Sequence, residues 1–110
     1  MASRTRSRKR VDFDTSLGGV RLGELHSFVV LCEELHFATA ARRLFLTPGG
    51  LSRRITHLEM TLGHRLLERT TRTVRLSEFG EKFAPAAKQM LKELNALQSI
   101  PGPRPAEANP

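Results

Sequence analysis

The fold is decided by residues 47–63, which read TPGGLSRRITHLEMTLG. Thr47 is a good helix N-cap, and Pro48 follows at the first helical position, where its missing N–H has no helical partner to lose. Gly63 can end the helix in the left-handed conformation. Between these ends, apolar residues recur in steps of four, three and four, the period of one helix face: Leu51, Ile55, Leu58 and Leu62.

The opposite face of this predicted helix is small and rich in hydrogen-bond donors. At about 100° per residue, the residues opposite the apolar stripe are Gly49, Arg53, Thr56 and Met60, with His57 beside them and Ser52 and Arg54 at the borders. An isolated helix of this kind is usually an ordinary amphipathic helix with a solvated polar face. The elements around it favour a different interpretation, a helix that enters the major groove of DNA.

Two helices are predicted before this segment, over residues 22–35 and 38–45. The second is short and alanine-rich, which allows another helix to approach it closely. A fourth helix is predicted after the N-cap candidate Ser77, and its apolar stripe continues to Leu97. Pro85 lies inside it and is expected to bend this helix rather than break it.

Two β-prone segments, residues 66–69 and 73–76, flank a short polar turn and predict a small hairpin, or wing. The fold class is therefore all-α with a small β wing: a winged helix-turn-helix followed by a long dimerisation or linker helix. The predicted organisation is a disordered basic arm at 1–19, the winged domain at 20–76, the linker helix at 77–100 and a disordered, proline-rich tail at 101–110.

The charge of the chain is high and unevenly distributed. Its 110 residues carry 18 lysines and arginines against 11 acids, a net charge of +7. The excess lies in residues 1–10 and 38–75, which indicates one surface facing a polyanion, either nucleic acid or an anionic membrane surface. A single cysteine and the lack of a long apolar run predict a soluble protein of the reducing cytoplasm that does not span a membrane.

The ordered series of motifs resembles a known family. Residues 22–97 are similar to the N-terminal DNA-binding domain and linker helix of LysR-type bacterial transcriptional regulators. The matching strings are LHSF at 25–28, FATAARRL at 37–44, LSRRI at 51–55, LE at 58–59, LG at 62–63, LLERT at 66–70, Arg72, and LSEFG at 76–80.

The resemblance implies a homodimer that binds double-stranded DNA and regulates transcription sequence-specifically. It also implies a place on the nucleoid in the bacterial cytoplasm. Each third helix would read a major-groove half-site, and each wing, residues 69–75, would touch the backbone or minor groove. By matching position, Ser52 and Arg53 are the helix contacts, Arg72 is the wing contact, and Thr47 reaches a phosphate. The full set predicted to contact DNA is Thr39, Thr47, Pro48, Gly49, Ser52, Arg53, Arg54, Thr56, His57, Arg69 and Arg72.

One departure from the family bears on specificity. The family usually has Ser-Gln-Pro-Ala where this chain has Thr47, Pro48, Gly49 and Gly50. Losing the glutamine removes an amide that could read an adenine edge. Base specificity is therefore expected to be relaxed, or redistributed toward Arg53, Arg54 and DNA shape.

The fourth helix has two interpretations. Its apolar stripe could simply cover the core of the domain, or it could pair with the same helix of a second chain. Its far end lies too distant along a rod of about 1.5 Å per residue to stay on so small a body, which favours pairing. The residues predicted to form the dimer are Phe79, Phe83, Met90, Leu94 and Leu97.

Other chemistry finds little support. No nucleophile with a base and carboxylate appears, nor a glycine-rich phosphate loop, so the chain is not expected to be an enzyme or to hold a cofactor. A metal pair of Cys32 with His26 or His36 is conceivable, but no metal is predicted. Family members normally continue into an effector-binding domain, so no small-molecule effector is expected on these residues.

Two alternatives to a sequence-specific regulator stay open. One is an interaction protein that heterodimerises through its linker helix with full-length relatives and withholds them from DNA. The other is an architectural protein that binds DNA without preference. The basic arm, from Arg4 to Arg10, is expected to add salt-sensitive, non-specific affinity.

Overall fold

The computed structural model describes residues 19–68 and 74–103. These residues form four helices: α1 (Leu22–Glu34), α2 (Phe37–Arg43), α3 (Pro48–Leu62) and α4 (Glu78–Gln98). One antiparallel bridge joins Leu67 to Leu76 between α3 and α4. The all-α class and the predicted order of elements are confirmed, and the helix ends differ from the predicted ones by two residues at most.

The helix ends follow the capping residues of the sequence. The hydroxyls of Thr47 and Ser77 accept hydrogen bonds from the backbone N–H groups of Gly50 and Gly80, each at 2.9 Å. Gly63 ends α3 with a φ of 77°. Leu35 ends α1 in the same left-handed region, with a φ of 57°, and its N–H bonds the Leu31 carbonyl oxygen at 2.7 Å.

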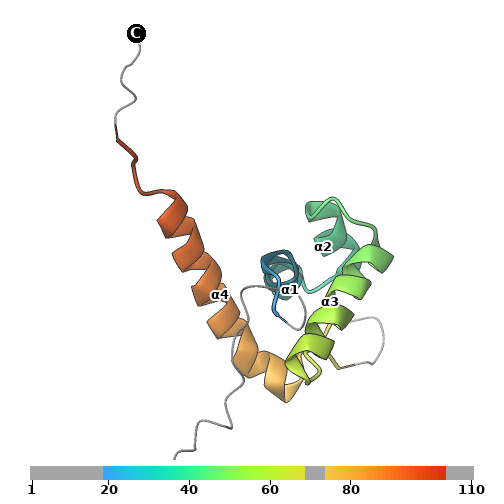
Figure 1. The fold of residues 1–110 in the computed structure, drawn as a ribbon. Helices are drawn as coiled ribbons and strands as arrows, with labels where there is room; N and C mark the ends of the chain where they lie inside the picture. The colour runs from blue at the N-terminus through green and yellow to red at the C-terminus, as the bar shows by residue number, and fades with distance from the viewer. Residues whose placement is uncertain (1–18, 69–73, 104–110) are drawn as a thin grey trace, which may run out of the picture.

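Helix α1 is the centre of the packing, since it contacts each of the other three helices. The core lies where it meets α2 and α3, and Figure 1 shows these three helices gathered together while α4 leaves them as a rod. The largest fully buried side chains are Phe28, Leu31, Leu51, Ile55, Leu58 and Leu66. The apolar stripe predicted for α3 is thus the face that packs on α1 and α2.

Helix α4 starts against this core and then departs from it. Phe83 contacts Phe28 of α1 with ring centroids 5.7 Å apart, and Phe79 lies 5.7 Å from Phe83. The helix continues through Pro85 without interruption, so the proline does not break it. Further along, Met90 and Leu97 are 56% and 62% exposed, whereas Leu91 between them still packs against the core.

Within the described residues, the flanks of the predicted wing pair through one bridge, through the hydrogen bond from Glu68 N–H to the Arg75 carbonyl at 2.9 Å and through an ion pair of these two side chains at 3.8 Å. The turn of the wing, with Arg69 and Arg72, lies outside the described residues. Residues 1–18 of the predicted arm and residues 104–110 of the tail lie outside them as well.

Candidate nucleic-acid interface

The two faces of α3 divide as the sequence predicts. Leu51, Ile55 and Leu58 are buried to 1% exposure or less. The predicted contact residues on the other side are exposed, except for the half-buried His57: Pro48, Gly49, Ser52, Arg53, Arg54 and Thr56. One exposed helix face therefore combines two hydroxyl groups, two guanidinium groups and a first turn with little side-chain bulk.

The first turn of α3 is held by Thr47 and left bare by Gly49. Thr47 Oγ1 accepts the Gly50 N–H, and a hydroxyl that accepts in this way still has its own proton to donate. A Cβ at Gly49 would meet nothing within 4 Å, whereas one at Gly50 would lie 3.2 Å from Thr47 Oγ1. The positive end of the helix dipole is thus presented on a surface that a phosphate can approach closely.

Two of the predicted contact residues are turned toward α1. Arg54 Nη1 lies 3.4 Å from the Gly23 carbonyl oxygen and 3.3 Å from Ser27 Oγ. His57 Nδ1 lies 2.7 Å from a carboxylate oxygen of Glu24, which is only 7% exposed. That pair is an ion pair when the imidazole is protonated, although its alignment is not that of a hydrogen bond. Sequence reasoning placed both side chains on DNA and missed Glu24 and Ser27 as their neighbours.

A buried carboxylate fixes the segment that leads from α3 into the wing. Glu59 is 7% exposed, and its Oε2 accepts hydrogen bonds from the N–H groups of Leu66 and Leu67 at 2.8 and 3.2 Å. Ser77 closes the other side, since its Oγ donates to the Arg65 carbonyl at 2.5 Å and its N–H to that of Leu66 at 2.9 Å. The base of the wing is therefore tied both to α3 and to the start of α4.

The sequence and the arrangement of helices are similar to those of known proteins. Residues 22–81 match the family described as bacterial regulatory helix-turn-helix protein, lysR family. The chain belongs to the LysR family. It is 45% identical over 76 residues to a probable hydrogen peroxide-inducible genes activator of Streptomyces viridosporus, covering 69% of this chain and 24% of that protein.

Solved structures of LysR-family proteins share the fold. An OxyR mutant of Corynebacterium glutamicum superposes with a TM-score of 0.72 at 36% identity, over 77% of this chain and 27% of that one. The DNA-binding domain of BenM in complex with catB site 1 DNA gives a TM-score of 0.70 at 36% identity, over 73% of this chain and 86% of that one. The winged helix-turn-helix class is confirmed, and the chain spans about a quarter of the full-length relatives.

The names of the relatives bear on two of the alternatives, an enzyme and an interaction protein. They are transcriptional regulators and activators, which confirms the prediction that the chain is not an enzyme. None of these names supports the alternative of an interaction protein that withholds its relatives from DNA. Nor does any helix in residues 19–68 or 74–103 combine the length and apolar character needed to cross a membrane.

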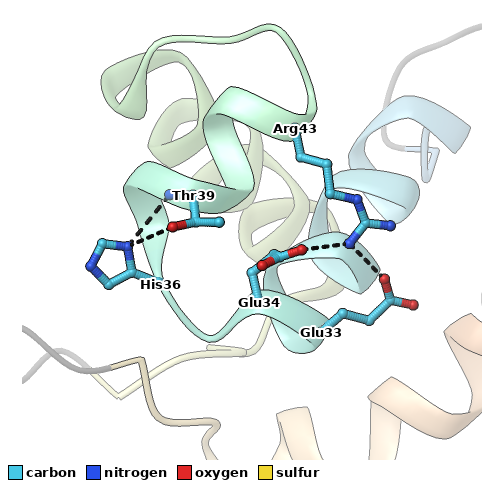
Figure 2. Close-up of polar contacts among 5 residues, drawn as sticks. All are labelled: Glu33, Glu34, His36, Thr39 and Arg43. Atoms are coloured by element: carbon cyan, nitrogen blue, oxygen red, sulfur yellow. Dashed lines mark hydrogen bonds and ion pairs between the residues drawn. The ribbon is translucent and has the colours of Figure 1, made fainter.

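Thr39 lies in the first turn of α2 in this LysR-type domain. Figure 2 shows His36 Nδ1 facing both the Thr39 N–H, at 3.4 Å, and the Thr39 hydroxyl, at 3.2 Å. At the other end of α2, Arg43 reaches back to Glu33 and Glu34 of α1, at 2.9 Å each. The hydrogen bond to Glu34 is the main cause, and that to Glu33 the next, of a pKa of Arg43 above its usual value. Arg43 thus links the end of α2 to the end of α1 through two ion pairs.

The residues predicted for dimerisation divide along α4. Phe79 and Phe83 pack inside the protomer, and Phe79 also stacks on His64 with ring centroids 4.6 Å apart. Met90 and Leu97 are exposed, and Leu94 is half-buried. Leu94 also lines an open groove of about 490 Å³ between α1 and α4, together with Leu22, Gly23, His26, Leu91, Asn95 and Gln98.

Cys32 is half-buried and packs against the core. Burial raises its pKa to about 11, against the opposing effect of Lys88. No group of three potential metal-ligating side chains is present in the described ranges.

Proposed function

We propose that this chain binds double-stranded DNA sequence-specifically, as the DNA-binding part of a bacterial transcription regulator. The observation that carries the proposal is the division of α3, whose buried stripe fixes it to the core while its exposed face offers Ser52, Arg53 and a capped, bare N-terminal turn. The complex of the similar BenM domain with catB site 1 DNA supports it.

Recognition would take place through α3 in the major groove. Arg53 can bond a guanine edge through two N–H groups, and Ser52 can donate to or accept from a base. The small first turn allows the helix to approach the base edges, while Thr47 and Thr39 reach phosphates. The wing, residues 69–75, would add Arg69 and Arg72 on the backbone or minor groove.

The functional unit would be a homodimer that uses the exposed part of α4. Met90 and Leu97 are exposed on α4, and Leu94 between them lines the open groove. A second α4 packed here would cover these apolar side chains and place two α3 helices on successive major-groove half-sites. We further propose that this dimer acts on the nucleoid in the bacterial cytoplasm.

The proposal is tested by fluorescence anisotropy. Duplex DNA enriched from a random pool by this chain is titrated beside a scrambled duplex of equal length, at two salt concentrations. Phosphate contacts weaken as salt rises whereas base contacts persist, so a preference of about tenfold or more at the higher salt is expected. Equal, purely salt-driven binding to both duplexes would contradict sequence-specific recognition and favour architectural binding.

A further inference from the structure

Helices α1 and α3 meet along a polar seam formed by Gly23, Glu24 and Ser27 of α1 with Arg54 and His57 of α3. Residues three or four apart share one helix face, so the acceptors of α1 and the basic side chains of α3 oppose each other. The contacts are Arg54 Nη1 to Gly23 O at 3.4 Å and to Ser27 Oγ at 3.3 Å, and His57 Nδ1 to Glu24 Oε2 at 2.7 Å. The seam lies at the flank of the face proposed to read DNA.

The α1 side of the polar seam presents hydrogen-bond acceptors to Arg54. Ser27 Oγ donates its proton to the Gly23 carbonyl at 2.8 Å, which leaves its lone pairs directed outward to Arg54. A Cβ on Gly23 would lie 3.3 Å from Arg54 Nη1, so the lack of a side chain at Gly23 makes room for the guanidinium group. The close packing at Gly23 and the hydrogen bond to Ser27 thus both place the Arg54 guanidinium group against this part of α1.

The carboxyl group of Glu24 is nearly buried beside α3. It is 7% exposed, and its Oε1 has no hydrogen bond among the described residues. A carboxylate buried in this way is costly unless a positive group lies near it. The structure places the Nδ1 edge of His57 against this carboxyl group, 2.7 Å from Oε2.

We propose that the polar seam sets the rotation of α3 about its own axis, with Arg54 acting as a positioning residue rather than a base reader. The apolar stripe of α3 holds the helix against the core, but such contacts are non-directional and allow small rotations. Hydrogen bonds are directional, so those that Arg54 donates across the seam define where Arg53 points. This proposal depends on the proposed function, because its consequence is a loss of base discrimination when α1 residues that touch no DNA are changed.

The closing experiment is a double-mutant cycle of Ser27→Ala and Arg54→Met, read as the ratio of affinities for the enriched and the scrambled duplex. Each single change is expected to lower this ratio by about threefold or more, and the double change to lower it little further, as for residues in contact. Ser27→Ala changes no charge, so its salt dependence should equal that of the wild type. Lys82→Met, which removes a charge from the exposed side of α4, is the charge-matched control and should leave the ratio unchanged.

Glu24 provides a test in which electrostatics and positioning predict opposite results. Removing a negative charge near DNA should tighten binding to every duplex. If Glu24 positions His57, then Glu24→Met lowers the preference ratio, whereas Glu24→Gln keeps a polar oxygen beside the Nδ1 edge of His57 and lowers the ratio less. Thermal unfolding of each variant shows whether it is folded at the temperature of the titration.

Three outcomes would overturn the proposal. Additive effects in the cycle, with a wild type that prefers its duplex, would overturn the seam alone and leave the proposed function intact. Coupling in the unfolding temperature without coupling in the preference ratio would reduce the seam to an ordinary packing contact. A wild type without any preference would overturn the seam and the proposed function together.

Discussion

A Cβ atom on Gly80 would lie 2.2 Å from the carbonyl oxygen of Leu66, so the first turn of α4 rests directly on the backbone that follows α3. Gly80→Ala must push these two segments apart, and such overpacking costs about 1–3 kcal/mol, occasionally more. We expect a lower free energy of unfolding in urea. Gly49→Ala is the matched control, since a Cβ there meets nothing, and it should stabilise α3 by up to about 1 kcal/mol. Similar values for both variants would contradict the close contact.

Glu59 should be more important for the base of the wing than for α3 itself. Glu59→Ala leaves the buried N–H groups of Leu66 and Leu67 without their carboxylate partner. The expected loss of stability is about 1.5–3 kcal/mol, as for hydrogen bonds to a charged group. Hydrogen exchange by NMR should show faster exchange at these two amides. Glu59→Gln, which keeps one acceptor, should lose less, and equal losses would argue against this role.

Arg53 is the side chain expected to read a base. Arg53→Ala should cost about 1–3 kcal/mol of binding free energy on the enriched duplex and much less on the scrambled one. Anisotropy titrations of the two duplexes measure this difference. Equal losses on both would make Arg53 a phosphate contact and would move base reading to other residues of α3.

Leu97 and Met90 should stabilise a dimer and not the protomer. Leu97→Glu places a charge where apolar surface is expected to be covered, which removes about 1.5–3 kcal/mol of burial and raises the dissociation constant about tenfold or more. Sedimentation equilibrium measures this constant, and circular dichroism should show an unchanged helix content. Lys82→Glu is the control on the same helix. A dimer that tolerates Leu97→Glu would exclude this part of α4 from the interface.

Cys32 should react slowly in the folded protein. Because its pKa is raised from 9.0 to about 11, the native thiol keeps most of its protons at pH 10, where the unfolded chain has largely lost them. Folding stability from this group is therefore present below pH 9 and is lost as the pH rises toward 11. Alkylation by iodoacetamide at pH 9 should be much slower in the native state than in urea. Equal rates would mean that the thiol is accessible and unshifted.

Features that depend on residues close together in the chain could be predicted from the sequence. Thr47, Ser77 and Gly63 cap helices through neighbours within three or four residues, so their roles follow from position alone. The buried stripe of α3 follows from its spacing in the same way. Pro85 was expected not to break α4, and the unbroken helix agrees.

The features that the sequence did not reveal depend on which helix faces lie opposite each other. Arg54 sits at the border of the polar face of α3, and its spacing does not distinguish a groove from a neighbouring helix. The acceptors that it meets are 27 and 31 residues away in the chain. Glu59 was overlooked for the same reason, although a carboxylate next to Leu58 at the edge of an apolar stripe was a usable signal. Phe79 was assigned to a dimer because periodicity does not show where the protomer core ends.

The bare surroundings of Gly49 have a consequence for how this protein can change over evolution. A position in the first turn of α3 where a Cβ meets nothing can accept many side chains without repacking the core. A new operator sequence could then be acquired through one substitution that leaves folding intact. Laboratory selection at this single codon is a direct way to redirect the protein to different promoters.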